Sequence, residues 1–576
     1  MRTGVIRCIA VATAVLVLAA CQPQGSTPVA QSAAPALPAK PAPVVPTADG
    51  RTSAAITAED FAARLKKVSS NEFEGRKPGA LGERITTAWI KDQFEQLGLK
   101  AGNKGNWFQT VPMVETSVND ADQVTLDVSV GGDRESFAYR KDLIVGSLNS
   151  TAGVDIKDSQ IVFAGYGVDA PEYQWNDYAG LDVKGKTVIV LVNDPGWGNH
   201  DDSLFKGPAL TYYGRWMYKF EEAARKGAAA CLIVHETAGA GYPWEVVVNS
   251  WDGVQDSLPA SEDPEPRLAA AGWITTDAAR RLFTKAGKDF DALKASSDQR
   301  GFTPSELGAS ASLHFVNTIA HSSSENVVGM IRGSTRPDEV VVYSAHWDHF
   351  GRDPQLAGDQ IYNGAIDNGT GIAALLELAE AFAHQDPPSQ RSLLFIADTL
   401  EEAGLLGSRY YVTHPSFPLT KTVADINIDA LPIMGLSKDV AVISWGQSEI
   451  DALIQAAASA QGRSVVPDDA PEKGFFFRSD QLHFARFGVP VLYLRSGLTL
   501  VDGGEEAGRK AYADYTANRY HKVTDEYDPN WDFRGVIQDI EAMHVVGRQL
   551  ADGRTFPQWN AGADFHRPQV PAAASK

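Results

Sequence analysis

Three apolar runs in the C-terminal half of the chain have the length and composition of buried strands. They occupy residues 340–343, 393–397 and 423–428, and stretches with helical periodicity alternate with them. Buried strands that alternate with helices are typical of a parallel sheet with helices on its faces. The pattern therefore predicts an α/β fold for the part of the chain after about residue 315.

The middle of the chain has a different pattern. Between about 123 and 235 it shows short strands, such as 160–163 and 187–192, and then a helix at about 212–227. A capping box at Thr57 and two helical patterns precede this region, and the strong apolar runs resume only after it. We therefore expect the middle to be an insertion into one catalytic domain.

Length, composition and charge limit the classes of function. With 576 residues, 44% of them hydrophobic, the chain can form about two or three domains with sizeable cores. Its formal net charge is −20, and no block of basic residues occurs. A surface that follows a phosphate backbone needs clustered Lys and Arg, so nucleic acid is excluded as a partner.

The N-terminus has the form of an export signal. Arg2 and Arg7 precede an apolar run at 9–20 that is too short to span a bilayer, which predicts a signal peptide at 1–20. The sequence Leu-Ala-Ala-Cys at 18–21 resembles the bacterial lipoprotein box, and this resemblance implies lipidation of Cys21. Residues 21–55, rich in Pro and Ala, then predict an extended tether. Gln22 is similar to a sorting signal for the outer membrane, so we expect an exported protein anchored by lipid and facing the periplasm.

Candidate metal ligands follow the three apolar runs. The carboxyl ends of parallel strands form one edge of a sheet, and binding sites lie there. A fourth candidate lies in a Gly-rich loop that opens a helix, and a fifth comes from far down the chain. These five residues are His346, Asp367, Glu402, Asp429 and His521. Two imidazoles and three carboxylates are what a pair of divalent ions needs, and Glu401 remains beside them as a base.

Each candidate also has a simpler explanation when it is taken alone. Asp367 has the position of a helix cap, and Asp429 that of a turn former before a proline. Asp348 favours the metal interpretation, because a carboxylate two residues after His346 can orient its imidazole. We interpret the remaining histidines of this region as surface or structural residues; they are His349, His384 and His414.

Five segments, in order, resemble the zinc aminopeptidase family that includes bacterial leucyl aminopeptidase, with glutamate carboxypeptidase and the glutaminyl cyclases as relatives. They are 344–349, 367–371, 401–408, 427–429 and 520–525, and the resemblance covers nearly all of 57–555. It implies a mixed, mostly parallel sheet flanked by helices. Segments 162–167 and 177–186 resemble a protease-associated domain, which implies that the insert is a β-rich α/β domain of this kind.

The resemblance also implies roles for single residues. Asp367 would bridge two zinc ions, with His346 and Asp429 at one ion and Glu402 and His521 at the other. Glu401 would be the general base that takes a proton from water and passes it to the departing amine. Further roles follow in the same way: Asp348 and Tyr520 among the catalytic residues, with Tyr520 steadying the oxyanion, and Ser479 and Asp480 lining the substrate pocket.

We expect the following domains: a signal peptide at 1–20, a lipidated tether at 21–55, a zinc peptidase domain at 56–122 and 315–555, a protease-associated insert at 123–314, and a disordered tail at 556–576. The insert would act as a pocket wall or lid, or as an interaction surface.

The resemblance predicts an exported dizinc aminopeptidase that acts on peptides. An acid-specific carboxypeptidase is the alternative, because four arginines near the site in sequence offer partners for carboxylates; they are Arg478, Arg486, Arg495 and Arg519. Glutaminyl cyclisation fits less well, since those relatives use one zinc. The intact ligand set argues against a receptor-like protein that has lost its metals.

Overall fold

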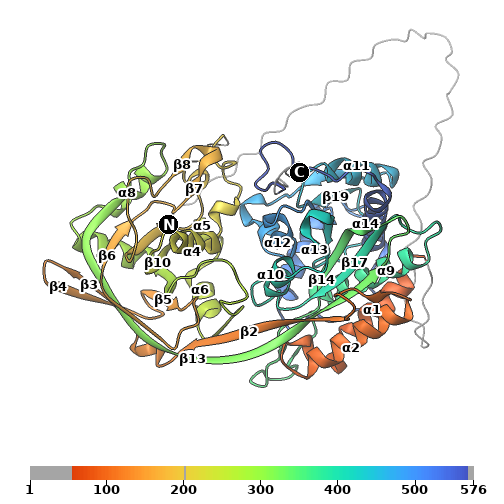
Figure 1. The fold of residues 1–576 in the computed structure, drawn as a ribbon, viewed down its shortest axis with the longest axis horizontal. Coiled ribbons are helices and arrows are strands. Elements are labelled where there is room, and N and C mark those ends of the chain that lie inside the picture. The colour runs from red at the N-terminus through yellow and green to blue at the C-terminus, as the bar shows by residue number, and fades with distance from the viewer. Residues whose placement is uncertain (1–54, 200, 202, 568–576) are drawn as a thin grey trace, which may run out of the picture. The chain divides into compact units, whose positions relative to one another are not determined.

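The computed structural model describes residues 55–199, 201 and 203–567 (Figure 1). The expected signal peptide, Cys21 and nearly all of the tether lie outside the described residues, as do residues 568–576. Among the residues that are described, no helix has both the length and the apolar character needed to cross a membrane.

The sheet of the peptidase domain is mixed and mostly parallel around its centre, as predicted. Strand β14 (Arg336–His346) lies between β17 (Arg391–Asp398) and β18 (Thr422–Asn427) and is parallel to both. Strand β21 (Val491–Ser496) adds in parallel to β18, whereas β13 (Ser305–Ile331) is antiparallel to β17. The parallel strands therefore present their carboxyl ends at one edge.

The rest of this sheet is built from shorter or outer strands. Strand β2 (Phe108–Val118) pairs with β13, and β11 (Val254–Ser257) pairs with β2. Strand β19 (Asp439–Val442) joins β21 to β20 (Ser464–Pro467), and β1 (Lys100–Ala101) pairs with β13. A separate hairpin consists of β15 (Gly351–Arg352) and β16 (Ile361–Tyr362).

Helices cover both faces of the peptidase sheet, and alternate residues of its strands divide between the two cores. Val341 and Tyr343 of β14 are buried in one core, and Val340 and Val342 in the other. The first core contains buried residues of α1 (Ala58–Val68), α2 (Leu81–Gln96), α9 (Thr370–Ala383), α11 (Ile450–Ala460) and α14 (Arg534–Asp552). The second contains residues of α10 (Leu406–Thr413) and α12 (Gln481–Arg486). Strands buried on both faces explain the continuous apolar runs of the sequence.

The insert has a hydrophobic core of its own, whose buried residues run from Val124 to Phe315. Its parallel strands are β6 (Gly153–Phe163), β9 (Thr187–Leu191), β10 (Ala230–His235) and β12 (Ala270–Thr275). Antiparallel partners are β3 (Thr125–Val130), β4 (Asp133–Ala138) and β5 (Leu143–Gly146), and β7 (Asp169–Ala170) pairs with β8 (Trp175–Asn176). The helices are α3 (Pro195–Asn199), α4 (Trp216–Arg225), α5 (Thr237–Ala240), α6 (Trp244–Trp251), α7 (Thr276–Lys285) and α8 (Phe290–Ser297).

One long strand belongs to both parts of the fold. Strand β13 pairs with β3 and β6 in the insert and with β2 and β17 in the peptidase domain, and Figure 1 shows its curved course. Ion pairs add to this connection: an Nη2 atom of Arg486 lies 2.8 Å from Glu221, and one of Arg409 lies 2.8 Å from Asp263. The first of these contacts connects helix α4 of the insert to the peptidase domain.

The C-terminal segment differs from the expected disordered tail. Trp559 donates a hydrogen bond of 3.0 Å from Nε1 to the carbonyl of Gly488, and Phe565 is 7% exposed within the second core. Aromatic residues that reach an existing core bury apolar area even from a polar segment. The packed chain therefore extends beyond residue 555, at least to 567.

Candidate active site

The structure brings the five predicted ligands together at the carboxyl edge of the sheet. His346 is the last residue of β14, and Asp429 comes two residues after β18. Atom Nε2 of His346 lies 3.2 Å from Oδ1 of Asp429 and 3.4 Å from Oδ1 of Asp367. Asp367 comes from the irregular turn that precedes α9.

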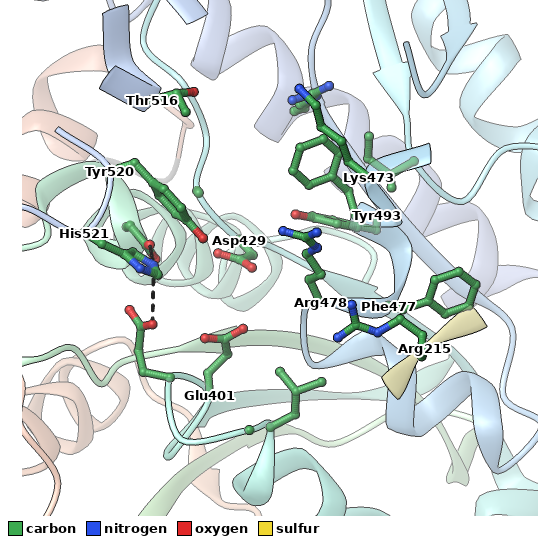
Figure 2. A pocket seen from close by; sticks show the side chains of 18 of the residues that line it. Arg215, Glu401, Asp429, Lys473, Phe477, Arg478, Tyr493, Thr516, Tyr520 and His521 are labelled. Atoms are coloured by element: carbon green, nitrogen blue, oxygen red, sulfur yellow. Dashed lines mark ion pairs between the residues drawn. The ribbon is translucent and has the colours of Figure 1, made fainter. Parts of the chain in front are cut away.

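The second oxygen of Asp367 faces a different histidine. Its Oδ2 lies 3.2 Å from Nε2 of His521, which is also 3.5 Å from Oε2 of Glu402. His521 follows α13 (Gly504–Asn518), and Figure 2 shows its ring directed toward the carboxylates. Asp367 therefore lies between two imidazoles, which is the position of a shared ligand.

The side chains at this edge are suited to hold divalent metal ions. Two groups of side chains have ligand atoms within 4.8 Å of one another, His346 with Asp367 and Asp429, and His349 with Asp367 and Glu402. Imidazole nitrogens and carboxylate oxygens are zinc ligands. Burial raises the pKa of Glu402 well above its usual range, and the nearby Asp367 carboxylate adds to this effect. Such a cluster of buried carboxylates is stabilised by cations among them.

His349, which we interpreted as a surface or structural histidine, is buried beside the candidate ligands. It is 1% exposed, and its Nδ1 lies 2.7 Å from Oε1 of Glu402. Burial lowers its pKa to about 3, so the ring is neutral. The sequence carries a signal for this residue, since it stands three positions after His346, at the same strand end.

Two buried carboxylates hold the loops that carry the ligands. Asp348 accepts hydrogen bonds from the backbone N–H of Glu401 at 3.1 Å and of Glu402 at 3.3 Å, and its backbone carbonyl lies 3.3 Å from Nδ1 of His346. Asp525 accepts from the N–H of Asp367 at 3.1 Å. Asp348 thus positions the glutamates through their backbone. Its carboxylate, which we expected to orient His346, lies 3.8 Å from Nδ1 of that ring, farther than the backbone carbonyl.

Glu401 lies beside the ligands. One of its oxygens is 4.0 Å from Nε2 of His346. Burial raises the pKa of Glu401 well above its usual range, and the carboxylates of Asp429 and Glu402 raise it further against the opposing effect of His346. A carboxylate with a raised pKa is suited to accept a proton near neutral pH.

A pocket of about 460 Å³ opens over these residues, and Tyr520 forms part of its wall. The ring of Tyr520 stacks on His521 with 3.8 Å between ring centroids, and Figure 2 shows its hydroxyl directed toward Asp429. Burial raises the pKa of Tyr520, so the hydroxyl stays protonated and can donate a hydrogen bond. This placement suits the oxyanion role that we expected.

Ser479 and Asp480 do not line this pocket, in contrast to our expectation. They are 1% and 0% exposed, and Oγ of Ser479 accepts a hydrogen bond of 2.8 Å from Asn427. The segment turns so that the preceding residues Phe477 and Arg478 face the pocket instead. A linear motif cannot reveal which of several neighbouring side chains faces the cavity.

The four arginines that suggested a carboxypeptidase have different surroundings. Arg478 and Arg495 line the pocket. Arg486 pairs with Glu221 of the insert, and Arg519 donates to the backbone carbonyls of Thr524 and Glu526. Only two of the four therefore face the site.

The insert contributes residues to the pocket that the sequence did not reveal. Arg215, Trp216 and Met217 line it, at and just before the start of α4. They lie more than a hundred positions from the ligands in sequence, and no motif marks them. The insert is therefore a wall of the pocket.

Comparison with known proteins follows this geometry. Residues 326–545 match the model of Peptidase family M28. The chain is 31% identical over 116 residues to aminopeptidase YwaD of Bacillus subtilis, which is 20% of this chain and 23% of the relative. It is 28% identical over 254 residues to probable leucine aminopeptidase 2 of Aspergillus oryzae. This match covers 42% of this chain and 48% of the relative. The first curated relatives are thus matched over less than a quarter of their length.

The overall structure is similar to a solved aminopeptidase from Aneurinibacillus sp. strain AM-1, with 17% identity, a TM-score of 0.46, and coverage of 89% of this chain and 96% of the other. The sequence match falls on the part of the chain that bears the site. All five predicted ligands lie within 326–545. Residues 326–545 are therefore similar to Peptidase family M28, and part of the chain is similar in sequence to aminopeptidases.

Proposed function

We propose that this chain is a dizinc exopeptidase that removes N-terminal residues from peptides. The observation that carries the proposal is the position of Asp367, whose two oxygens face His346 and His521 at 3.4 and 3.2 Å. Glu401 lies beside this pair and is not needed as a ligand. The similarity of 326–545 to Peptidase family M28, and of part of the chain to aminopeptidases, supports the same reaction.

The roles of the residues follow from the contacts. His346, Asp367 and Asp429 would hold one ion, and Asp367, Glu402 and His521 the other. Two bound cations would lower the pKa of a shared water and polarise the scissile carbonyl. Glu401 takes the proton of the water and delivers it to the departing amine. Tyr520 donates its O–H to the oxygen that gains negative charge.

A paired assay tests this function. The zinc-loaded protein is expected to cleave a leucine anilide with a free amine and to leave the N-acylated anilide intact, with activity lost on chelation and restored by zinc. Release of anilide is followed by absorbance. Cleavage of both anilides would reject an aminopeptidase. Cleavage of an N-acylated peptide at its C-terminus would instead select the carboxypeptidase alternative.

We further propose that the chain is a lipoprotein exported to the cell envelope, and that its insert is a protease-associated domain. The lipoprotein proposal rests on Cys21 and the apolar run before it. A single acyl chain binds a membrane only marginally, whereas several acyl chains anchor a protein stably.

The variant Cys21→Ser is expected to leave the membrane fraction and to accumulate as soluble protein or uncleaved precursor. Fractionation and mass measurement of the N-terminus check this, with the wild type as reference. Normal processing together with unchanged membrane association of the variant would contradict lipidation at Cys21.

A further inference from the structure

We propose that the pocket contains a subsite for a carboxylate of the peptide substrate, formed by Arg215 of the insert and Arg478 of the peptidase domain. This inference rests on the proposed peptidase function and adds a substrate class to it. The subsite would make acid-bearing peptides the preferred substrates.

The acidic and basic side chains of the pocket lie at different ends. Asp367, Glu401, Glu402 and Asp429 gather at the metal end, and the cations Arg215, Lys473, Arg478 and Arg495 lie among the other lining residues. Figure 2 shows Arg215 and Arg478 on the side of Glu401 that faces away from His521. The carboxylates at the metal end would be neutralised by two divalent ions, so they would not form ion pairs with the arginines.

Neither arginine has an anionic partner within the described part of the chain. No carboxylate oxygen there lies within 4.0 Å of Arg215 or Arg478, and Nε of Arg215 is buried without a hydrogen-bond partner. Burial, together with the positive charge of Arg478, lowers the pKa of Arg215 to about 10. Two neighbouring guanidinium groups that repel each other are stabilised by an anion that binds between them.

The other two cations are less suited to this role. Arg495 already lies 2.7 Å from Asp469 and 3.7 Å from Asp468, which satisfy its charge. Lys473, like Arg478, is exposed and has its cationic group over the ring of Phe475, but its single ammonium cannot bind a carboxylate through two parallel hydrogen bonds as a guanidinium can. Arg215 and Arg478 are therefore the two guanidinium groups of the pocket that have no carboxylate within 4.0 Å in the described part of the chain.

The start of α4 adds to the preference for an anion. This ten-residue helix begins directly after Arg215, its first turn contains no acidic residue, and no side chain caps it. Trp216 and Met217 of the same turn line the pocket. The N-terminal end of a helix carries partial positive charge, and here no acidic side chain of the first turn offsets it.

Two features of a peptide can supply the carboxylate. One is the acidic side chain of an N-terminal Asp or Glu, and the other is the C-terminal carboxylate of a very short peptide. Three substrates separate them: Leu-Leu-amide has neither group, Glu-Leu-amide has only the side chain, and Leu-Leu has only the free terminus.

The test compares kcat/KM on the three substrates for the wild type, Arg215→Gln and Arg478→Gln, all loaded with zinc. The wild type is expected to prefer one acid-bearing substrate over Leu-Leu-amide, and either variant to lose about 10–100-fold on that substrate, as for the loss of a hydrogen-bonded ion pair. Cleavage of Leu-Leu-amide should fall less than cleavage of that substrate, because Leu-Leu-amide has no carboxylate for either arginine to bind. The matched control is Arg280→Gln, an exposed arginine of the insert that pairs with Asp291.

A failure of the carboxylate subsite can be distinguished from a failure of the proposed peptidase function. The subsite would be overturned, and the peptidase function left intact, by either of two results. One is a wild type that cleaves Leu-Leu-amide at least as well as both acid-bearing peptides. The other is an equal loss of kcat/KM on all three substrates in the arginine variants. If no substrate is cleaved, titration calorimetry with Glu-Leu-amide and Leu-Leu decides whether the subsite binds a carboxylate. Binding weakened in Arg215→Gln but not in Arg280→Gln supports the subsite and rejects the peptidase, whereas equal binding in both variants rejects the subsite.

Discussion

The variant Glu401→Gln is expected to lose about 10²–10⁴-fold in kcat while it keeps both metal ions. Glutamine has the size of glutamate but cannot accept the proton of water. Asp348 holds the backbone N–H of Glu401 at 3.1 Å, so the loop should keep its position. Turnover and metal content measured on the same preparation check this result.

The adjacent glutamate is the matched control. Glu402→Gln is expected to weaken one metal site and to regain part of its activity in excess zinc, because an amide oxygen is a poorer ligand than a carboxylate. The roles would be reversed if Glu401→Gln lost metal and Glu402→Gln kept it. If both variants remained fully active, the dizinc mechanism would be rejected.

The α/β core could be predicted from the sequence because burial on both faces of a strand leaves a continuous apolar run. The run at 393–397 lies within β17, and that at 340–343 within β14. The ligands could be proposed because parallel strands deliver the residues after them to one edge. His346 is the last residue of its strand, and Asp429 comes soon after β18, so their meeting follows from topology.

Side-chain direction and long-range packing could not be predicted in this way. Ser479 is buried while its neighbour Arg478 faces the pocket, and one position along the chain decides the difference. The burial of His349 beside Glu402 could not be predicted, because its place three residues after His346 marks the same strand end but not the direction of its side chain. Arg215 reaches the pocket only through the contacts between the insert and the peptidase domain, which no local pattern encodes.

The variant Asp367→Ala is expected to have the largest effect on metal content. Asp367 faces both His346 and His521, so its removal takes a ligand from each ion, whereas His346→Ala and His521→Ala each affect one. We expect Asp367→Ala to retain less than about one ion per chain and to lose almost all activity. Each single histidine variant should retain about one tightly bound ion.

His349→Ala is the informative control for this series. Its Nδ1 contacts Glu402 at 2.7 Å, so we expect it to orient that carboxylate and not to bind the ion itself. The variant should then retain two ions with affinity weakened about 10–100-fold at one site. Elemental analysis after dialysis, with zinc titration of each apo-protein, measures these values. Two tightly held ions in Asp367→Ala would contradict the role of Asp367 as a bridging ligand. Both His349 and His521 reach Glu402, so the comparison of their variants decides between them. If His349→Ala lost one ion and His521→Ala did not, His349 would be the ligand.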